Sequence, residues 1–167
     1  MLLNRRGEYA LLGLLYLARQ DRTASSGRFW DVNDVARSVG VPEKFLRILF
    51  HQLAKSGLLR SQRGSGGGFS LKKPAAQTSV REVIEAIQGP IAPFICVASD
   101  SDPEDCHRFG RCELYGLLRE VRLKIIDELD RHTLSDLIGV DLAAPGAVGV
   151  NGNGTDDGGE SSGETED

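Results

Sequence analysis

Apolar residues recur at helical spacing in two adjacent segments between residues 31 and 55. In the first segment, a stripe at positions i, i+3, i+4 and i+7 is formed by Val32, Val35, Ala36 and Val39. Asp31 or Asn33 could cap the start of this helix with a side-chain oxygen. Gly40 follows the stripe and can adopt the positive φ of a tight turn. The pattern predicts a short helix that ends in a turn.

The second segment predicts a longer helix with one apolar and one basic face. Pro42 is favoured in the first turn of such a helix. The expected buried side consists of Phe45, Leu46, Leu49, Phe50 and Leu53. The basic side consists of Lys44, Arg47, His51 and Lys55. Two helices joined by a tight turn, the second basic, are typical of a helix-turn-helix that enters a major groove, although a solvated surface helix has the same charge pattern.

A glycine-rich hairpin is predicted directly after this helix. Leu58 and Leu59 begin one strand, residues 69–71 lie on the returning strand, and the string RGSGGG lies between them. Glycines such as Gly64 allow a tight tip and a close approach of the backbone to another surface. Arg63 at this tip fits the narrow, electronegative minor groove of DNA. The glycines have neither Rossmann nor Walker spacing, so nucleotide binding is rejected.

Further helices are predicted on both sides of this unit. Residues 2–19 form an opening helix, since nearly every residue of Tyr9–Ala18 is apolar. A later helix begins at a capping box formed by Ser79 and Glu82 and ends at Gly89. The fold class is therefore mainly α with a small β-hairpin wing, a winged helix-turn-helix.

A long C-terminal dimerisation helix is predicted over Glu113–Asp130. One apolar stripe is formed by Leu114, Leu117, Leu118, Val121 and Ile125, and Leu123, Ile126 and Leu129 widen it. This apolar surface is wider than one small domain needs to cover, so we expect a seam between two subunits. Thr133 and Asp136 cap a final turn.

Charge divides the chain into parts with different expected roles. Residues 1–89, the predicted winged helix-turn-helix DNA-binding domain, hold 14 Lys/Arg and 7 Asp/Glu, a net charge of +7. Two predicted parts follow: an irregular cysteine-containing loop over residues 90–112, and the dimerisation helix with the C-terminal turn over residues 113–141. Together they hold 6 Lys/Arg and 11 Asp/Glu, a net charge of −5. Residues 142–167 hold 0 and 6, a net −6, and are predicted to be a disordered acidic tail. The net charge of −4 therefore conceals a basic DNA-binding part.

Two classes of protein are disfavoured by the sequence. No run of roughly 18 apolar residues indicates a membrane span, and the first residues do not form a secretory signal, so we expect a cytoplasmic protein. His51, His107 and His132 form no spaced set, and no Ser-His-Asp or metal-hydrolase pattern is present. We therefore do not expect an enzyme.

The wing carries a resemblance to a known family. The pattern L-x-S-x-R-G-x-x-G-G-F-x-L, residues 59–71, is similar to the wing signature of the Rrf-type winged-helix regulators, the family of IscR, NsrR and RirA. The segment VPEKFLRILFHQLAKSGLL resembles their recognition helix, and the resemblance covers about residues 1–139. It implies that Lys44, Arg47 and Arg63 face DNA. The full set of predicted DNA-binding residues is Lys44, Arg47, His51, Arg63, Gly64 and Arg5.

The three cysteines all lie in the loop 90–112, with the spacing C-x9-C-x5-C. An odd number in a reducing compartment argues against structural disulfides. Ordinary free thiols are usually buried in helices and strands, so their gathering in one polar loop suggests metal ligands. Zinc favours closely paired cysteines, which are missing here, whereas iron–sulfur clusters accept wider spacing. His107 would join a zinc site only with awkward geometry beside Cys106.

The resemblance favours the iron–sulfur alternative. Cys106 and Cys112, with the leucine-rich helix that follows, resemble NsrR, and three such cysteines hold a [2Fe–2S] or [4Fe–4S] cluster in related members; Cys96 is the third. The gap of nine residues after Cys96 is longer than in IscR or NsrR, which leaves the cluster type open. The histidine ligand of IscR corresponds to Tyr115 here, so it is not carried over. The remaining candidates for the fourth ligand are Glu8, supplied by the partner subunit in NsrR-like members, and His107.

The sequence thus predicts a homodimeric, DNA-binding transcriptional regulator, in our expectation a repressor. Its operator binding would be controlled by an iron–sulfur cluster that senses redox, nitric oxide or iron status. The alternative is a cluster-free member of the same family that uses its thiols, or a protein partner, to sense redox or sulfur status.

Overall fold

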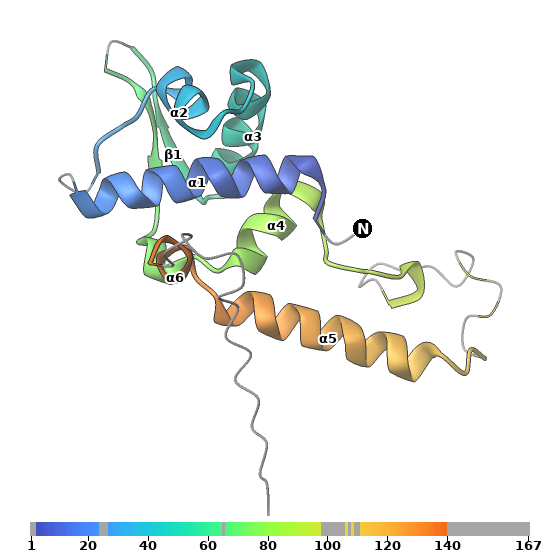
Figure 1. Cartoon of the computed structure of the whole chain (residues 1–167). Coiled ribbons are helices and arrows are strands. Elements are labelled where there is room, and N and C mark those ends of the chain that lie inside the picture. Colours follow the sequence, from blue (N-terminus) through green and yellow to red (C-terminus); the bar gives the residue numbers. More distant parts are fainter. Residues whose placement is uncertain are drawn as a thin grey trace, which may run out of the picture.

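The computed structural model describes residues 3–23, 27–64, 66–97, 106, 108 and 111–139. The elements in chain order are α1 (Arg5–Thr23), α2 (Val32–Val39), α3 (Glu43–Lys55), β1 (Leu59–Gln62), β2 (Gly68–Leu71), η1 (Ala75–Gln77), α4 (Val80–Gln88), η2 (Ile95–Val97), α5 (Tyr115–Arg131) and α6 (Leu134–Ile138). In Figure 1, α1 crosses the middle, with α2, α3 and the hairpin above it and α4, α5 and α6 below it. The mainly helical fold with one small hairpin is as the sequence predicted.

The helix-turn-helix is fixed by local caps. The Asp31 carboxylate accepts a hydrogen bond of 2.7 Å from the backbone N–H of Asn33, so Asp31 is the residue that caps α2. Gly40 ends α2 with φ of 69°, in the left-handed region where a side chain is disfavoured. Pro42 is the residue before α3 and does not lie within its first turn, which corrects the predicted start by one position.

The wing is a two-stranded antiparallel sheet in which Leu59 pairs with Leu71 and Gln62 with Gly68. The segment before α2 extends this sheet, because Trp30 and Phe69 exchange two backbone hydrogen bonds of 2.9 Å. This pairing of Trp30 with β2 was not predicted from the sequence. It attaches the wing to the segment before α2, so β2 is paired with β1 on one side and with Trp30 on the other.

One apolar core joins α1, α2, α3, the wing and α4. Its fully buried members include Leu14, Leu46, Phe50 and Val83, and the ring of Phe50 meets that of Phe69 edge-on at 5.2 Å. The prediction that Phe45 belongs to the buried side of α3 is wrong, since Phe45 is 38% exposed. Its ring instead packs edge-on against Tyr9 of α1 at the border of the core.

The helices below α1 are held together by α4. Its N-terminus has the predicted capping box of Ser79 and Glu82. Arg81 of α4 forms an ion pair of 2.8 Å with Asp130 of α5. Thr133 and Asp136 form a second capping box at the start of α6, as predicted.

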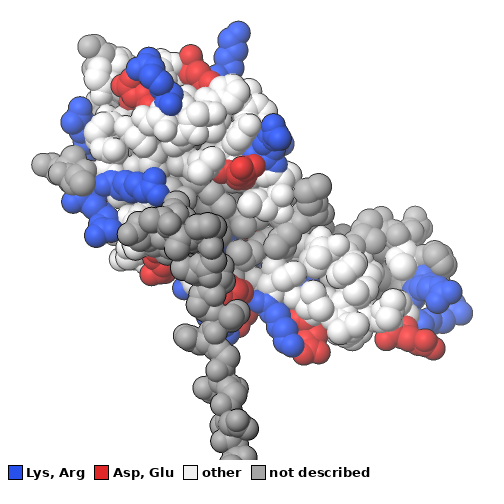
Figure 2. Space-filling view, viewed as in Figure 1, with Lys and Arg blue, Asp and Glu red and all other residues white. Residues whose placement is uncertain are grey.

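The first half of α5 is only partly covered by the other described residues, among which η2 contacts α5. Apolar side chains near its C-terminal half pack against α4, whereas Leu114 and Leu117 are each 58% exposed and Val121 is 37% exposed. Figure 2 shows a broad uncharged area over this lower arm, with charged side chains at its edges. This exposed stripe is the surface that the sequence predicted as a dimer seam.

Two further helices, α1 and α5, have boundaries that differ from the sequence prediction. Helix α1 begins at Arg5 and continues to Thr23, so part of the predicted polar loop after residue 19 is helical. Helix α5 begins at Tyr115, two residues later than predicted. Among the described helices, none has the length and apolar character to span a bilayer.

Candidate nucleic-acid interface

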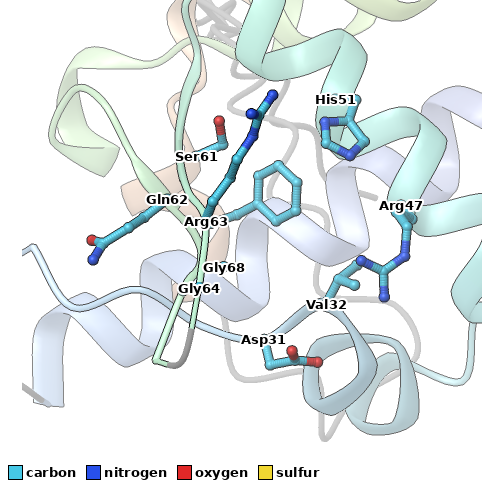
Figure 3. A pocket seen from close by; sticks show the side chains of 11 residues that line it. Asp31, Val32, Arg47, His51, Ser61, Gln62, Arg63, Gly64 and Gly68 are labelled. Carbon is cyan, nitrogen blue, oxygen red and sulfur yellow. The ribbon is translucent and has the colours of Figure 1, made fainter.

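A hollow with a volume of about 390 Å³ lies between α3 and the wing. Arg47 and His51 line it from α3, and Arg63 and Gly64 line it from the wing. In Figure 3, the side chains of Arg47 and His51 come from α3, and Arg63 runs back along the hairpin beside them. The structure therefore brings together four of the six predicted DNA-binding residues.

The two α3 side chains in the hollow are positioned by their neighbours. Because Leu46 and Leu49 on the opposite face are buried, the basic side of α3 must face outward. The ring of His51 stands edge-on to Phe69 of β2 at 5.2 Å. Arg47 forms an ion pair of 2.6 Å with Glu43 one turn earlier. Such an exposed pair contributes little to stability, so a phosphate can replace the carboxylate at low cost.

Glycines determine the shape of the wing tip. Gly64 has φ of 95°, and a Cβ atom there would meet nothing within 4 Å. A side chain would therefore fit in space, and glycine is favoured at this position only because of its positive φ. Gly68 has φ of 147°, and a Cβ atom there would lie 2.2 Å from the carbonyl oxygen of Trp30. Gly68 is therefore needed for the close approach between the wing and the segment before α2.

Arg63 lies differently from the sequence prediction. The glycine-rich tip predicted a side chain that projects away from the hairpin. The structure instead places Arg63 on the lining of the hollow, on the side that faces His51. Arg63 forms no ion pair with any other described residue. Its guanidinium is therefore available to an external anion.

The remaining predicted residues lie outside this hollow. Lys44 is exposed in the first turn of α3, and Arg5 is exposed at the start of α1. Sequence reasoning missed the three other polar side chains of the lining, those of Asp31, Ser61 and Gln62. Asp31 was recognisable only as a cap, and the two strand residues carry no distinctive pattern.

This arrangement can hold a polyanion. A helix and a two-stranded ribbon are the elements that fit the major groove of B-DNA. Arginine donates two parallel hydrogen bonds to a phosphate or to a guanine edge. Arg47 and Arg63 flank the hollow from opposite sides, so a strand of DNA lying across it would meet cations from both elements.

The cysteines lie apart from this interface. Cys96, Cys106 and Cys112 are free thiols, and each is partly buried. Cys96 belongs to the short helix η2, and Cys112 lies just before α5. Among the described residues, no three His, Cys, Asp or Glu side chains form a group that could hold a metal ion. His107 lies outside the described residues.

Glu8 lies in the exposed first turn of α1. No hydrogen bond or ion pair to another described residue holds its carboxylate. One turn further along the helix, Leu12 is 38% exposed, and on the adjoining α3 Ile48 is 63% exposed. Among the described residues, the Glu8 carboxylate thus has no partner, and it lies one turn before the exposed Leu12 of α1.

Comparison with known proteins gives a consistent family. Residues 3–139 match the sequence model of the Rrf2 family, which is described as iron-dependent transcriptional regulators. The rrf2-like HTH-type transcriptional regulator of Rhodobacter capsulatus is 32% identical over 139 residues, which cover 82% of this chain and 92% of that protein. An HTH-type transcriptional regulator of Mycobacterium tuberculosis is 29% identical over 139 residues, 83% of this chain and 82% of that protein.

Solved structures share the fold. CymR, the global cysteine regulator of B. subtilis, superposes with a TM-score of 0.63 at 26% identity, over 84% of this chain and 99% of CymR. IscR of T. potens superposes with a TM-score of 0.59 at 22% identity, over 83% of this chain and 87% of IscR.

Proposed function

This chain belongs to the Rrf2 family of transcriptional regulators, and on that premise we propose that it binds operator DNA as a homodimer and represses transcription, with its DNA affinity controlled by an iron–sulfur cluster. The matched proteins are regulators and not enzymes. The observation that carries the DNA-binding part is the hollow between α3 and the wing. Arg63, which has no ion pair among the described residues, lies on one side of it, and Arg47 and His51 lie on the other.

In the proposed complex, α3 of each subunit enters a major groove. The two grooves would be about 34 Å apart, one turn of the duplex, so the operator would be a pseudo-palindrome. Arg63 would reach the phosphates or the minor groove beside each half-site. Lys44 and Arg5 are exposed cations outside the hollow, and they would contact the flanking backbone.

The DNA-binding part is tested with Arg63→Gln. Loss of one phosphate contact per subunit should weaken binding to duplex DNA at least about tenfold and reduce the salt slope by about 1 per subunit. Fluorescence anisotropy at several salt concentrations measures both. Lys124→Gln is the matched control, since Lys124 is an exposed cation of α5 paired with Glu120. Equal affinity and slope in Arg63→Gln and wild type would refute the role of the wing.

Homodimer formation is supported by the uncovered stripe of α5. Leu114, Leu117 and Val121 lie on one side of the helix and remain exposed in the single subunit. A contiguous apolar surface of this kind usually marks a protein interface. Two copies that pack along α5 would bury it and would join the two DNA-binding units.

The cluster part is supported by donor chemistry. Three free thiols, from Cys96, Cys106 and Cys112, lie between the DNA-binding unit and α5 in the sequence, and thiolates are the ligands that hold iron–sulfur clusters. Glu8 of the partner subunit, or His107, would complete the set. When bound, the cluster would supply reversible chemistry toward oxidants, nitric oxide or iron depletion. The carboxylate of Glu8 has no hydrogen-bond or ion-pair partner among the described residues and lies one turn before the exposed Leu12, so it is available to a second subunit.

The cluster is tested by anaerobic purification of the full chain. We expect a coloured protein that contains iron and acid-labile sulfide, both lost in Cys106→Ser. Glu8→Gln should change the absorption spectrum or speed the loss of iron in air, whereas Glu120→Gln, at an exposed acid of α5 that pairs with Lys124, serves as control. A colourless protein that contains zinc, or no metal, would refute cluster binding and leave the DNA-binding proposal standing.

A cluster-free function is the second candidate, and the likeness to CymR favours it. CymR is described as a global cysteine regulator, and this chain carries three free thiols that could respond to redox or sulfur status. In this alternative the thiols, or a partner protein, would sense redox or sulfur status. It predicts that DNA affinity responds to thiol oxidation in protein without iron. DNA affinity measured with and without iron at a fixed redox potential separates the two candidates.

A further inference from the structure

A second cavity, with a volume of about 370 Å³, lies where the wing joins the body of the subunit. It is open to solvent on one side and is lined by the end of α1, the base of the wing and α6, elements that Figure 1 shows at the same end of the molecule. Its charged and polar lining consists of Asp21, Arg22, Arg60, Lys72, Lys73 and Ser135. Figure 2 shows Lys and Arg side chains gathered around this end of α1. The family's DNA-binding elements, α3 and the wing tip, do not line it.

The positive charge of this cavity is only partly neutralised within the subunit. Lys73 is paired with Glu82 at 2.9 Å. Asp21 is the acid of the lining. Burial raises the pKa of its carboxyl group above the usual value, and the nearby Arg60 offsets part of this effect. Arg22 and Lys72 form no ion pair with any other described residue. Apart from the pair of Lys73 with Glu82, three cations and one acid line the cavity, which leaves an excess of positive charge for an anion.

The cavity also has an apolar wall and a neutral donor. Leu71 and alanines of α1 and η1 supply the wall, and Ser135 of α6 supplies a hydroxyl group. The Arg60 guanidinium lies 6.0 Å from the centre of the Phe29 ring, which limits its movement. Small-molecule sites commonly combine an apolar wall with a few convergent polar groups, and this volume is at the lower end of their range.

We propose that this cavity binds a small organic anion, whose carboxylate or phosphate group pairs with Arg22, Arg60 and Lys72 and whose carbon skeleton lies against the apolar wall. Arginine is suited to such groups because it donates two parallel hydrogen bonds. The size and the mixed lining fit a small metabolite better than a polymer. This site is separate from the cysteines and from the DNA-facing hollow.

The position of Arg60 makes this ligand an effector of the wing. Arg60 and Ser61 are neighbours on β1; Arg60 lines this cavity, whereas Ser61 lines the DNA-facing hollow. An anion that holds Arg60 would therefore restrain the strand that leads directly to Arg63. A ligand can change DNA affinity only if it binds two states of the wing differently.

Binding is tested by isothermal titration calorimetry of the full chain with inorganic phosphate and with succinate, at matched ionic strength. We expect a saturable signal from at least one probe. In Arg22→Gln and in Lys72→Gln the dissociation constant should rise at least about tenfold, because a charge-assisted hydrogen bond is lost. Lys124→Gln makes the same charge change on α5 and should bind as wild type. Both lining residues are exposed, so the variants should keep cooperative melting.

Three results would overturn the proposal. One is the lack of saturable binding for both probes, and another is equal binding in wild type and both lining variants. The third is that Arg22→Gln and Lys72→Gln, without added anion, weaken duplex DNA binding and lower its salt slope as Arg63→Gln should. That result would make the cavity a contact for the DNA backbone. The binding measurement needs no DNA, so its failure leaves the DNA-binding proposal untouched.

Discussion

Gly13 sets how closely α1 packs against α3, and Gly13→Ala tests this spacing. A methyl group at position 13 would lie 2.6 and 2.9 Å from two carbons of the Phe50 ring and 3.0 Å from a methyl carbon of Leu46. Both neighbours have 0% exposure, so neither can move aside into solvent. Helix propensity alone would make the change stabilising by about 0.5–1 kcal/mol, but overpacking a core costs about 1–3 kcal/mol. We expect a net loss of about 1–2 kcal/mol.

The assay is urea unfolding, followed by circular dichroism at one fixed protein concentration. Gly116→Ala is the matched control: position 116 is helical, and a Cβ atom there would meet nothing within 4 Å. Because no atom would clash with the methyl group, only the higher helix propensity of alanine acts at position 116. We therefore expect the free energy of unfolding to rise by up to about 1 kcal/mol. If Gly13→Ala is as stable as wild type, the glycine does not set the distance between α1 and α3, and the argument for a rigidly positioned recognition helix fails.

Three further predictions follow from single contacts. Leu117 is 58% exposed and lies in the proposed seam, so Leu117→Asn should reduce the free energy of dimer formation by about 1–2 kcal/mol per subunit. The dimer dissociation constant, measured by sedimentation equilibrium, should rise at least about tenfold. An unchanged constant would contradict the seam. Hydrogen bonds from the N–H and hydroxyl of Thr133 lower the pKa of Asp136 below its usual 3.8, so its stabilisation is present above that pH and is lost as pH falls through the lower folded value. When the free energy of unfolding is measured as the pH is lowered below 3.8, Asp136→Asn should therefore lose less of it than wild type. An equal loss in the two proteins would contradict the role of Asp136 in the cap. Gly68→Ala should push the wing from Trp30, the single tryptophan, and shift its fluorescence; an unaltered spectrum would show that the hairpin tolerates a side chain there.

The elements and their caps could be predicted because their causes are local. Apolar spacing defines each helix face, and the boxes of Ser79 with Glu82 and of Thr133 with Asp136 join residues three positions apart. Gly40 needed no partner to be recognised as a turn. The predicted metal ligands stay predictions, since cysteines can be found in a sequence but their assembly depends on a partner or on folding of the loop.

Contacts between distant segments were decided by the tertiary structure alone. The bridge between Trp30 and Phe69, the exposure of Phe45 and the inward course of Arg63 depend on how the wing docks against α1 and α3. The cavity at the wing base likewise joins α1, β1 and α6, which no periodicity relates. Periodic patterns report which face of an element is buried, whereas the partner of that face is chosen by packing shape and by the positions of glycines, which only the folded chain reveals.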